Sequence, residues 1–214
     1  TYAIPNISID HFPVSMPMPT GPWRGLANSY NCFFVEGFID ELAHNAGVEP
    51  FSFRMQMLAG QTRLARCLKE VATMVDLDGD AASSGRGIAC HSMRGSHIAV
   101  IVTVRNGKSG IRVDRIDAMA DCGRLINPDL ARQQIEGGIV FGLAQALGSA
   151  TNFERGLPTA RRLRDINLPK LADTPEINVE LVRNDEAPGG VTPIIGPATQ
   201  TDTAGNTTTS TANT

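Results

Sequence analysis

Two short stretches carry residue types that commonly bind metal ions. Residues 76–80 (DLDGD) offer three carboxylates, but a calcium loop of the EF-hand type needs glycine at its sixth position and glutamate at its twelfth. Here the glycine stands fourth, and the twelfth residue is Gly87. His91 and His97 are six residues apart, which fits neither one helix face nor a zinc signature. The sequence therefore predicts no metal site at either place, and we expect both histidines to make ordinary hydrogen bonds.

Other common site chemistries are not supported either. The sequence contains no GxSxG, P-loop or GxGxxG motif. Its cysteines form no CxxC pair, so we expect buried, reduced thiols and no zinc or iron–sulfur site made by this chain alone. These are Cys32, Cys67, Cys90 and Cys122. The net charge is -3, and the basic cluster Arg161, Arg162 and Arg164 has no aromatic ladder beside it, so no nucleic-acid surface is predicted.

The most informative stretch is a helix-like run that contains three glycines. Asn127 predicts an N-cap and Pro128 a first helical residue. One apolar stripe follows at helical spacing, made by Ile135, Ile139, Leu143 and Leu147. Glycine inside a helix costs roughly 1 kcal/mol relative to alanine, so Gly137, Gly138 and Gly142 indicate a very close neighbour. That neighbour is either a bound group or a tightly packed sheet, and spacing alone leaves both open.

The remaining elements follow from periodicity and turn residues. Five prolines within residues 1–22 predict an extended opening segment. Phe34, Phe38 and Leu42 predict an amphipathic helix that begins near Asn31 and ends at Gly47. Further expected elements are short helices at residues 50–58 and 64–75, a hairpin of strands at 97–104 and 111–120, and a last strand at 177–182.

These elements predict an α/β (α+β) fold with a mixed, mainly antiparallel sheet covered by helices. We divide the chain into an extended and helical part at residues 1–80, an αβ part at 81–198 and a threonine-rich tail at 199–214, in which little regular structure is expected. Residues 1–22 and the helix faces near 33–42 are expected to pack against another polypeptide. No apolar run is long enough to cross a membrane, and no signal peptide opens the chain. We expect its first residues to lie inside a longer polypeptide.

Six motifs occur in an order that is specific in combination. They are P-x-G-P-W-R-G at residues 19–25, F-F-V-E-G-F-I-D-E-L-A at 33–43, G-R-G-I-A at 85–89, D-C-G-R-x-x-N-P-D at 121–129, Q-x-E-G-G-x-x-x-G-L at 134–143 and D-E-A-P-G-G-V at 185–191. Across about residues 1–198 the chain thereby resembles the molybdenum-binding large subunit of the xanthine dehydrogenase and aldehyde oxidase family, in its isoquinoline 1-oxidoreductase and aldehyde dehydrogenase type. Such a subunit is several times longer, so the resemblance implies a C-terminal fragment of it.

The resemblance implies a molybdenum–molybdopterin cofactor, in bacteria commonly the cytosine dinucleotide form, shared with the rest of the subunit. Gln134 would hydrogen-bond the pterin, and Gly137 and Gly138 would allow its close approach. Gly95 and Ser96 match a small-residue turn of the family at the sheet edge, and they too are expected to bind the cofactor. Arg24 and Trp23 match positions near the substrate, although a structural salt bridge is an equal alternative for Arg24. No residue is assigned as a metal ligand.

The resemblance also implies partners and a reaction. The family oxidises an aldehyde or N-heterocycle with oxygen derived from water, and electrons leave through a partner subunit with [2Fe-2S] clusters, in some cases to a cytochrome. Both a cytoplasmic and a periplasmic location are compatible with it. Isolated from the remainder of the molybdenum subunit, this chain is expected to be inactive.

One family feature is missing. The family places its catalytic glutamate in a G-E-P-G or G-E-P-P loop, and no such step follows the match that ends at Val191. Glu186 aligns with a different glutamate, so it receives no catalytic role and the catalytic residue is unknown. Two interpretations therefore stand: a portion of a molybdenum hydroxylase, or a non-catalytic binding or scaffold domain derived from that fold.

Overall fold

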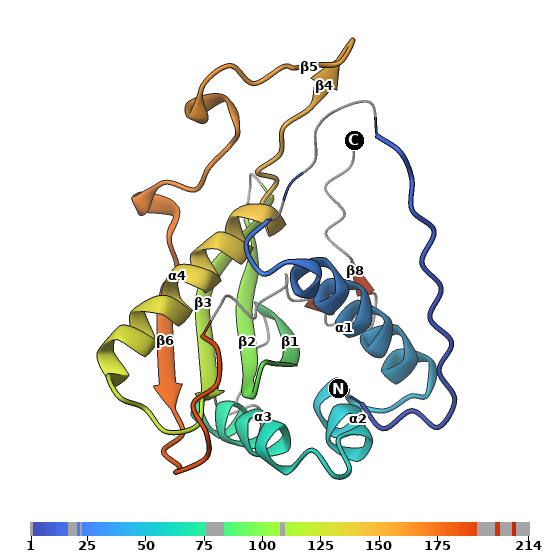
Figure 1. Cartoon of the computed structure of the whole chain (residues 1–214), viewed down its shortest axis with the longest axis vertical. Coiled ribbons are helices and arrows are strands. Elements are labelled where there is room, and N and C mark those ends of the chain that lie inside the picture. The colour runs from blue at the N-terminus through green and yellow to red at the C-terminus, as the bar shows by residue number, and fades with distance from the viewer. Residues whose placement is uncertain are drawn as a thin grey trace.

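The protein has three layers, in which helices cover both faces of one central sheet (Figure 1). The structure is a computed structural model, and it describes residues 2–16, 21, 23–75, 84–107, 110–191, 200–201 and 207–208. Its main sheet has the strand order β6-β3-β2-β1-β7-β8. Strands β1 (Ser84–Met93), β2 (Ser96–Gly107) and β3 (Gly110–Asp121) form an antiparallel meander, and β6 (Glu176–Leu181) runs parallel to β3. The predicted α/β fold with a mixed, mainly antiparallel sheet is confirmed.

Strand β2 shows how the sheet separates two cores. Alternate side chains of a strand point to opposite faces, and Ile98 and Val100 belong to one apolar cluster while Ala99 and Ile101 belong to the other. The first cluster is closed by α4 (Pro128–Ala146), which connects β3 to the region before β6. The second is closed mainly by α3 (Thr62–Val75), whose buried residues Leu64, Cys67, Leu68 and Val71 lie along one helix face.

Of two further helices, α2 (Pro50–Met57) contacts α3, and α1 (Ala27–Asn45) contacts α2 and β1. Glu49 begins α2 by accepting hydrogen bonds from the backbone N–H groups of Phe51 and Ser52, as an N-cap carboxylate does. Because one buried cluster joins these helices to the sheet, residues on both sides of position 80 share a core. The proposed domain boundaries stay predictions.

The apolar stripe predicted on α1 divides: Leu42 packs against the buried core, whereas Phe34 and Phe38 face outward. Tyr30, Phe34 and Phe38 are exposed by 55%, 64% and 58%, and we call these three residues the α1 aromatic patch. The helix instead buries Cys32, Glu36, Gly37, Ile39, Asp40 and Ala43. An outward aromatic patch of this kind is what a surface that packs against another polypeptide requires, and that contact stays a prediction.

Beyond α4 the chain forms an exposed arm (Figure 1). It contains a small hairpin of β4 (Phe153–Glu154) and β5 (Leu157–Pro158) and two 3-10 turns, η1 (Leu163–Asp165) and η2 (Leu171–Asp173). The arginine cluster lies here and is exposed. No described helix combines the length and apolar character that crossing a bilayer needs.

Several element predictions are confirmed, and one strand was missed. The helices, the hairpin and the strand near 177–182 all occur, and described residues 2–16 contain no helix or strand. Strand β1 escaped prediction because Gly85 and Gly87 interrupt any apolar alternation at its start. In the structure it is paired along its whole length with β2. Most of the threonine-rich tail lies outside the described residues, which include only the two-residue strands β7 (Gln200–Thr201) and β8 (Thr207–Thr208) of it.

Candidate functional site

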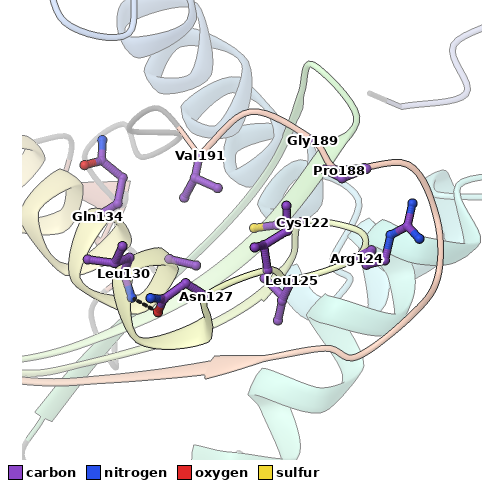
Figure 2. Close-up of a pocket in the computed structure, with 11 residues that line it drawn as sticks. Cys122, Arg124, Leu125, Asn127, Leu130, Gln134, Pro188, Gly189 and Val191 are labelled. Carbon is purple, nitrogen blue, oxygen red and sulfur yellow. Dashed lines mark hydrogen bonds between the residues drawn. The ribbon is translucent and has the colours of Figure 1, made fainter.

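The first turn of α4 borders an open pocket of about 280 Å³. Asn127 caps the helix, its Oδ1 accepting from the Leu130 N–H at 3.0 Å, and Pro128 stands at the start, as predicted. Nearly two turns later, Gln134 lines the pocket together with Cys122, Gly189 and Val191. Figure 2 shows Gln134, Cys122 and Val191 around one hollow, whereas the Arg124 side chain points away from Gln134. The pocket thus joins the D-C-G, Q-x-E-G-G and E-A-P-G-G-V motifs.

Asp121 ties the walls of this pocket together. Its buried carboxylate accepts two hydrogen bonds from Arg63, at 2.9 Å from Nε and 2.6 Å from Nη2. It also accepts from the Gly123 N–H at 3.0 Å and from the Asn184 amide. Burial opposes ionisation, but these donors hold the pKa of Asp121 below its usual range. Asp121 therefore links α3, the turn after β3 and the segment after β6.

Two glycines allow the segment after β6 to lie directly on its neighbours. A Cβ on Gly123 would stand 2.3 Å from the Ala187 carbonyl oxygen, and one on Gly189 would stand 2.3 Å from Ser96 Oγ. The Gly189 N–H donates to the Cys122 carbonyl at 2.9 Å, and the Gly190 N–H donates to the Arg94 carbonyl at 3.1 Å. Close packing inside this chain thus explains the glycines at positions 123 and 189.

Gly95 and Ser96 lie at the turn between β1 and β2, with Gly189 packed against them. The Ser96 side chain is fully buried, and neither residue lines the pocket. In this chain the predicted cofactor-side turn therefore supports the Gly189 segment. A direct role of Gly95 and Ser96 toward a cofactor stays a prediction.

A second group of side chains lies farther along the same face of α4. Arg24 Nη1 donates to the Gly137 carbonyl at 3.4 Å, and its guanidinium lies 5.5 Å from the ring centroid of Phe141. The Trp23 ring lies 5.5 Å from the same ring. Within the described part of the chain no carboxylate pairs with Arg24, so the salt-bridge alternative finds no support there. Gln134, Gly137, Trp23 and Arg24 therefore lie along one face of α4, and their roles toward a cofactor or substrate stay predictions.

The three helix glycines divide into two kinds. Gly138 and Gly142 are buried, which agrees with the packing alternative. Gly137 is exposed, and a Cβ added there would meet only Arg24 Nη2, at 4.0 Å. Packing within the described residues therefore gives no reason for glycine at position 137. The Gln134 side chain is also exposed and makes no hydrogen bond with described residues.

The structure assigns Glu186 a backbone role. Its side chain is exposed, its carbonyl oxygen accepts from the Arg124 N–H at 2.9 Å, and its own N–H donates to Asn184 Oδ1 at 3.0 Å. These bonds shape the wall of the pocket without using the carboxylate. Residues 192–199, where the family loop with the catalytic glutamate would be sought, lie outside the described residues.

Sequence reasoning missed a buried charged cluster between α1, α2 and β1. Arg54 donates from Nε to Glu36 at 3.0 Å and from Nη1 to Asp40. Glu36 also accepts from the Tyr2 hydroxyl at 2.7 Å and from the Cys90 N–H at 3.0 Å. Glu36 and Asp40 stand one turn apart in the apolar helix α1, and this spacing of two carboxylates is the signal that could have revealed the cluster. Burial raises the pKa of Asp40 to about 6 although Arg54 lowers it.

The structure also places the histidines and cysteines that the sequence singled out. His91 lies 3.2 Å from Asn28 Oδ1 and His97 lies 2.7 Å from Ser92 Oγ, so both are ordinary hydrogen-bonded histidines. All four cysteine side chains are buried, and burial raises the pKa of the Cys67 thiol to about 12. Among the described residues no group of three or more metal-binding side chains occurs. The rejected calcium loop at 76–80 lies outside them.

Three known proteins are similar to this chain over most of its length. The chain is 28% identical over 207 residues to the beta subunit of isoquinoline 1-oxidoreductase from Brevundimonas diminuta, covering 92% of this chain and 26% of that protein. It is 27% identical over 202 residues to membrane-bound aldehyde dehydrogenase (pyrroloquinoline-quinone) of Gluconacetobacter polyoxogenes, covering 82% and 26%. It is also 27% identical over 216 residues to a nicotinate dehydrogenase subunit of Pseudomonas putida, covering 88% and 18%. The chain thus spans about a quarter or less of these relatives.

The fold matches a solved structure over most of the chain. The aldehyde oxidoreductase from Desulfovibrio desulfuricans aligns with a TM-score of 0.55 at 12% identity, covering 83% of this chain and 37% of that one. The sequence signature of the molybdopterin cofactor-binding domain matches residues 60–175, which is more than half of the chain. These residues include Asp121, Gln134 and the whole of α4. The chain therefore belongs to the molybdopterin cofactor-binding domain family.

Proposed function

We propose that this chain forms the cofactor-contacting portion of a molybdenum hydroxylase large subunit that oxidises an aldehyde or an N-heterocycle. The observation that carries the proposal is the open face of α4 at Gln134 and Gly137. An exposed glycine in the middle of a helix gains nothing from packing inside the described chain, and a neighbouring amide without hydrogen bonds is available to a bound group. Relatives whose names specify isoquinoline, aldehyde and nicotinate support the substrate classes.

The residues of this face fit a molybdopterin, in the proposal its cytosine dinucleotide form. The Gln134 amide can donate to and accept from the pterin ring, and the missing side chain at Gly137 leaves room for a flat group against the helix. When bound, the group supplies oxygen transfer from water to an electron-poor carbon and takes up the electrons released. The [2Fe-2S] clusters of a partner subunit, and in some assemblies a cytochrome, would then receive these electrons.

Arg24 has the chemistry to act on the substrate side. Its guanidinium is half-buried beside Gly137 and can stabilise negative charge that develops on a bound carbonyl or heterocycle. Trp23 is exposed by 61% next to it and can cover a flat substrate while excluding water. The pocket beside Gln134 is bordered by Cys122 and Gly189, whose positions depend on Asp121.

The α1 aromatic patch supports the assembly part of the proposal. A monomeric surface rarely leaves several large aromatic side chains of one helix face in water, and about three quarters of the length of these relatives lies outside the part that this chain covers. We therefore assign the patch to contact with the remainder of the large subunit. A wall of the cofactor site made by that remainder would also explain why this chain contributes only one open face.

The second candidate is a non-catalytic binding or scaffold domain of the same fold. The specific observation in its favour is that no G-E-P-G step follows Val191, so this chain provides no identified general base. Turnover of an aldehyde or N-heterocycle by the cofactor-loaded assembly would support the enzyme. Full cofactor loading without any turnover would support the scaffold.

The test of the cofactor face compares Gln134→Ala with Gln133→Ala, its exposed neighbour on the same helix that does not line the pocket. Molybdenum and pterin are quantified in the chain assembled with the remainder of its large subunit. Losing the proposed hydrogen bond to the pterin should weaken cofactor binding by about 1–3 kcal/mol, or roughly 5- to 150-fold, in the first variant only. Equal retention in both variants would contradict the proposal, as would near-stoichiometric molybdenum in the isolated chain, which has only one wall of the site.

A further inference from the structure

We infer that Phe141 is a positioning residue that holds Arg24 and Trp23 against the open face of α4. Phe141 lies four residues after Gly137 and seven after Gln134, a spacing that places all three on one helix face. The inference rests on the proposed function only where it takes the open face of α4 to be the cofactor side. The contacts of Phe141 with Trp23 and Arg24 lie within this chain.

Phe141 is the common neighbour of both side chains. Its ring centroid lies 5.5 Å from that of Trp23, with the planes tilted by 41°, and 5.5 Å from the Arg24 guanidinium carbon. These are the distances of an aromatic pair and of a cation–π contact. The only other contact that holds the Arg24 guanidinium among the described residues is the long 3.4 Å hydrogen bond to the Gly137 carbonyl. Phe141 therefore provides most of what keeps this arginine in place.

The backbone before α1 delivers both side chains to that ring. The Leu26 N–H donates to the Trp23 carbonyl at 2.9 Å and closes a tight turn. Gly25 has φ +87°, and Leu26 has φ +54°, a value that costs energy for a residue with a branched side chain. Such a turn persists only when its surroundings fix it, and the contacts of Trp23 and Arg24 with α4 do so.

An aromatic ring at position 141 offers a ring face to a guanidinium, which an aliphatic side chain cannot do. A guanidinium stacked on a ring keeps its N–H donors at its edge, where they remain available to another group. Leucine would fill much of the same volume but would offer no ring face to the guanidinium or the indole. The identity of residue 141 should therefore set the direction of Arg24 and the mobility of Trp23.

Trp23 is the single tryptophan of the chain, so its fluorescence reports this cluster directly. We compare Phe141→Leu, Phe141→Tyr and the matched control Phe34→Leu, which removes an exposed ring that contacts Tyr30 and Phe33 instead. The measurements are acrylamide quenching and anisotropy of Trp23 in the purified full chain, with the denaturation midpoint of each variant recorded.

Phe141→Leu should lower the ratio of docked to undocked Trp23 by about two- to fivefold, the size of an exposed cation–π or aromatic contact. Quenching should then rise and anisotropy fall, while Phe141→Tyr restores both and Phe34→Leu changes neither. Unchanged quenching in Phe141→Leu, or an equal change in Phe34→Leu, would overturn the inference. A failed rescue by Phe141→Tyr at unchanged denaturation midpoint would overturn it as well.

Pterin retention in the assembled subunit separates this inference from the proposed function. Phe141→Leu leaves Gln134 and Gly137 in place, so it should retain pterin within about twofold of the unaltered chain. A loss as large as that of Gln134→Ala would make Phe141 part of cofactor binding and would refute a positioning role. Absence of pterin from the unaltered assembly would refute the proposed function, whereas the Trp23 measurements would still decide the role of Phe141.

Discussion

Replacing Asp121 by asparagine should destabilise the walls of the pocket, although Asp121 itself does not line the pocket. The Asp121 carboxylate receives hydrogen bonds from Arg63 in α3, from the Gly123 N–H and from Asn184. Asparagine keeps the size of the side chain but removes its charge and one acceptor oxygen, so its amide group must face donors. The change therefore tests whether a single buried charge holds three segments together.

The expected cost can be worked out from the burial of the two partners. Breaking a buried ion pair typically costs about 3–5 kcal/mol because the remaining charge stays buried. Asp121 is 2% exposed in its side chain, but Arg63 is 27% exposed and can turn partly toward water. We therefore expect Asp121→Asn to lower the free energy of unfolding by about 2–3 kcal/mol at neutral pH.

The assay is denaturant unfolding at several pH values, combined with amide hydrogen exchange. The folded protein holds the pKa of Asp121 below its usual range, so its stabilising contribution is present above the unfolded pKa of about 4. That contribution is lost as pH falls through the lower folded pKa, and the difference between variant and unaltered chain should shrink there. At neutral pH the N–H groups of Arg124 and Gly189, which bond across the pocket wall, should exchange faster in the variant.

The matched control is Asp114→Asn. Asp114 pairs with Arg105 at 3.0 Å on the surface, where the two side chains are 32% and 55% exposed, so its loss should cost no more than about 1 kcal/mol. If Asp121→Asn costs no more than this control, or leaves the exchange of Gly189 unchanged, the reasoning about Asp121 is wrong.

Two other perturbations test the helical side of the molecule. Burial raises the pKa of Asp40 to about 6 against the opposing effect of Arg54, so its contribution to stability is greatest below its unfolded pKa and is lost as pH rises through 6. The unaltered chain should lose up to roughly 3 kcal/mol relative to Asp40→Asn between pH 4 and 7, and parallel pH profiles of unfolding would contradict this. Phe34→Ser combined with Phe38→Ser should reduce binding of an apolar dye and self-association on gel filtration because both rings are more than half exposed. Leu171→Ser, on the arm and 92% exposed, is the control, and equal dye binding by the double variant and the unaltered chain would remove the α1 aromatic patch as a contact surface.

Local sequence patterns predicted α4 well because its N-cap and its apolar stripe each depend on residues that are close together in the sequence. The Asn127 cap, Pro128 and the buried Ile135 and Ile139 occur as the spacing indicated. The fold class followed from the same kind of signal, since hairpin and helix periods are readable over a few residues. Strand β1 was not readable in this way, because long-range pairing with β2 overrides its glycine-rich start.

The site depends on contacts between residues far apart in sequence, which periodicity does not reveal. Arg24 and Gly137 are separated by more than half of the chain, and no local pattern in the sequence relates them. The links of Asp121 with Arg63 and Asn184 were not expected at all. A single aspartate followed by cysteine and glycine gives no local pattern that would predict its hydrogen-bond partners. Its role emerges only when α3 and the segment after β6 are brought to the same turn.

The glycines show most clearly where local reasoning reached its limit. From the sequence, Gly137 and Gly138 were assigned the same explanation, a close neighbour of the helix. The structure buries Gly138 against the protein and leaves Gly137 in the open, with only the end of a flexible arginine near its missing side chain. Within the described residues an alanine at 137 would therefore fit and would favour the helix by roughly 1 kcal/mol. The glycine is explained if a group from outside this chain lies against α4 at that position, beside the amide of Gln134. Gly137→Ala should accordingly stabilise the isolated chain and weaken retention of the pterin in the assembly, two opposite effects that a purely structural glycine would not produce together.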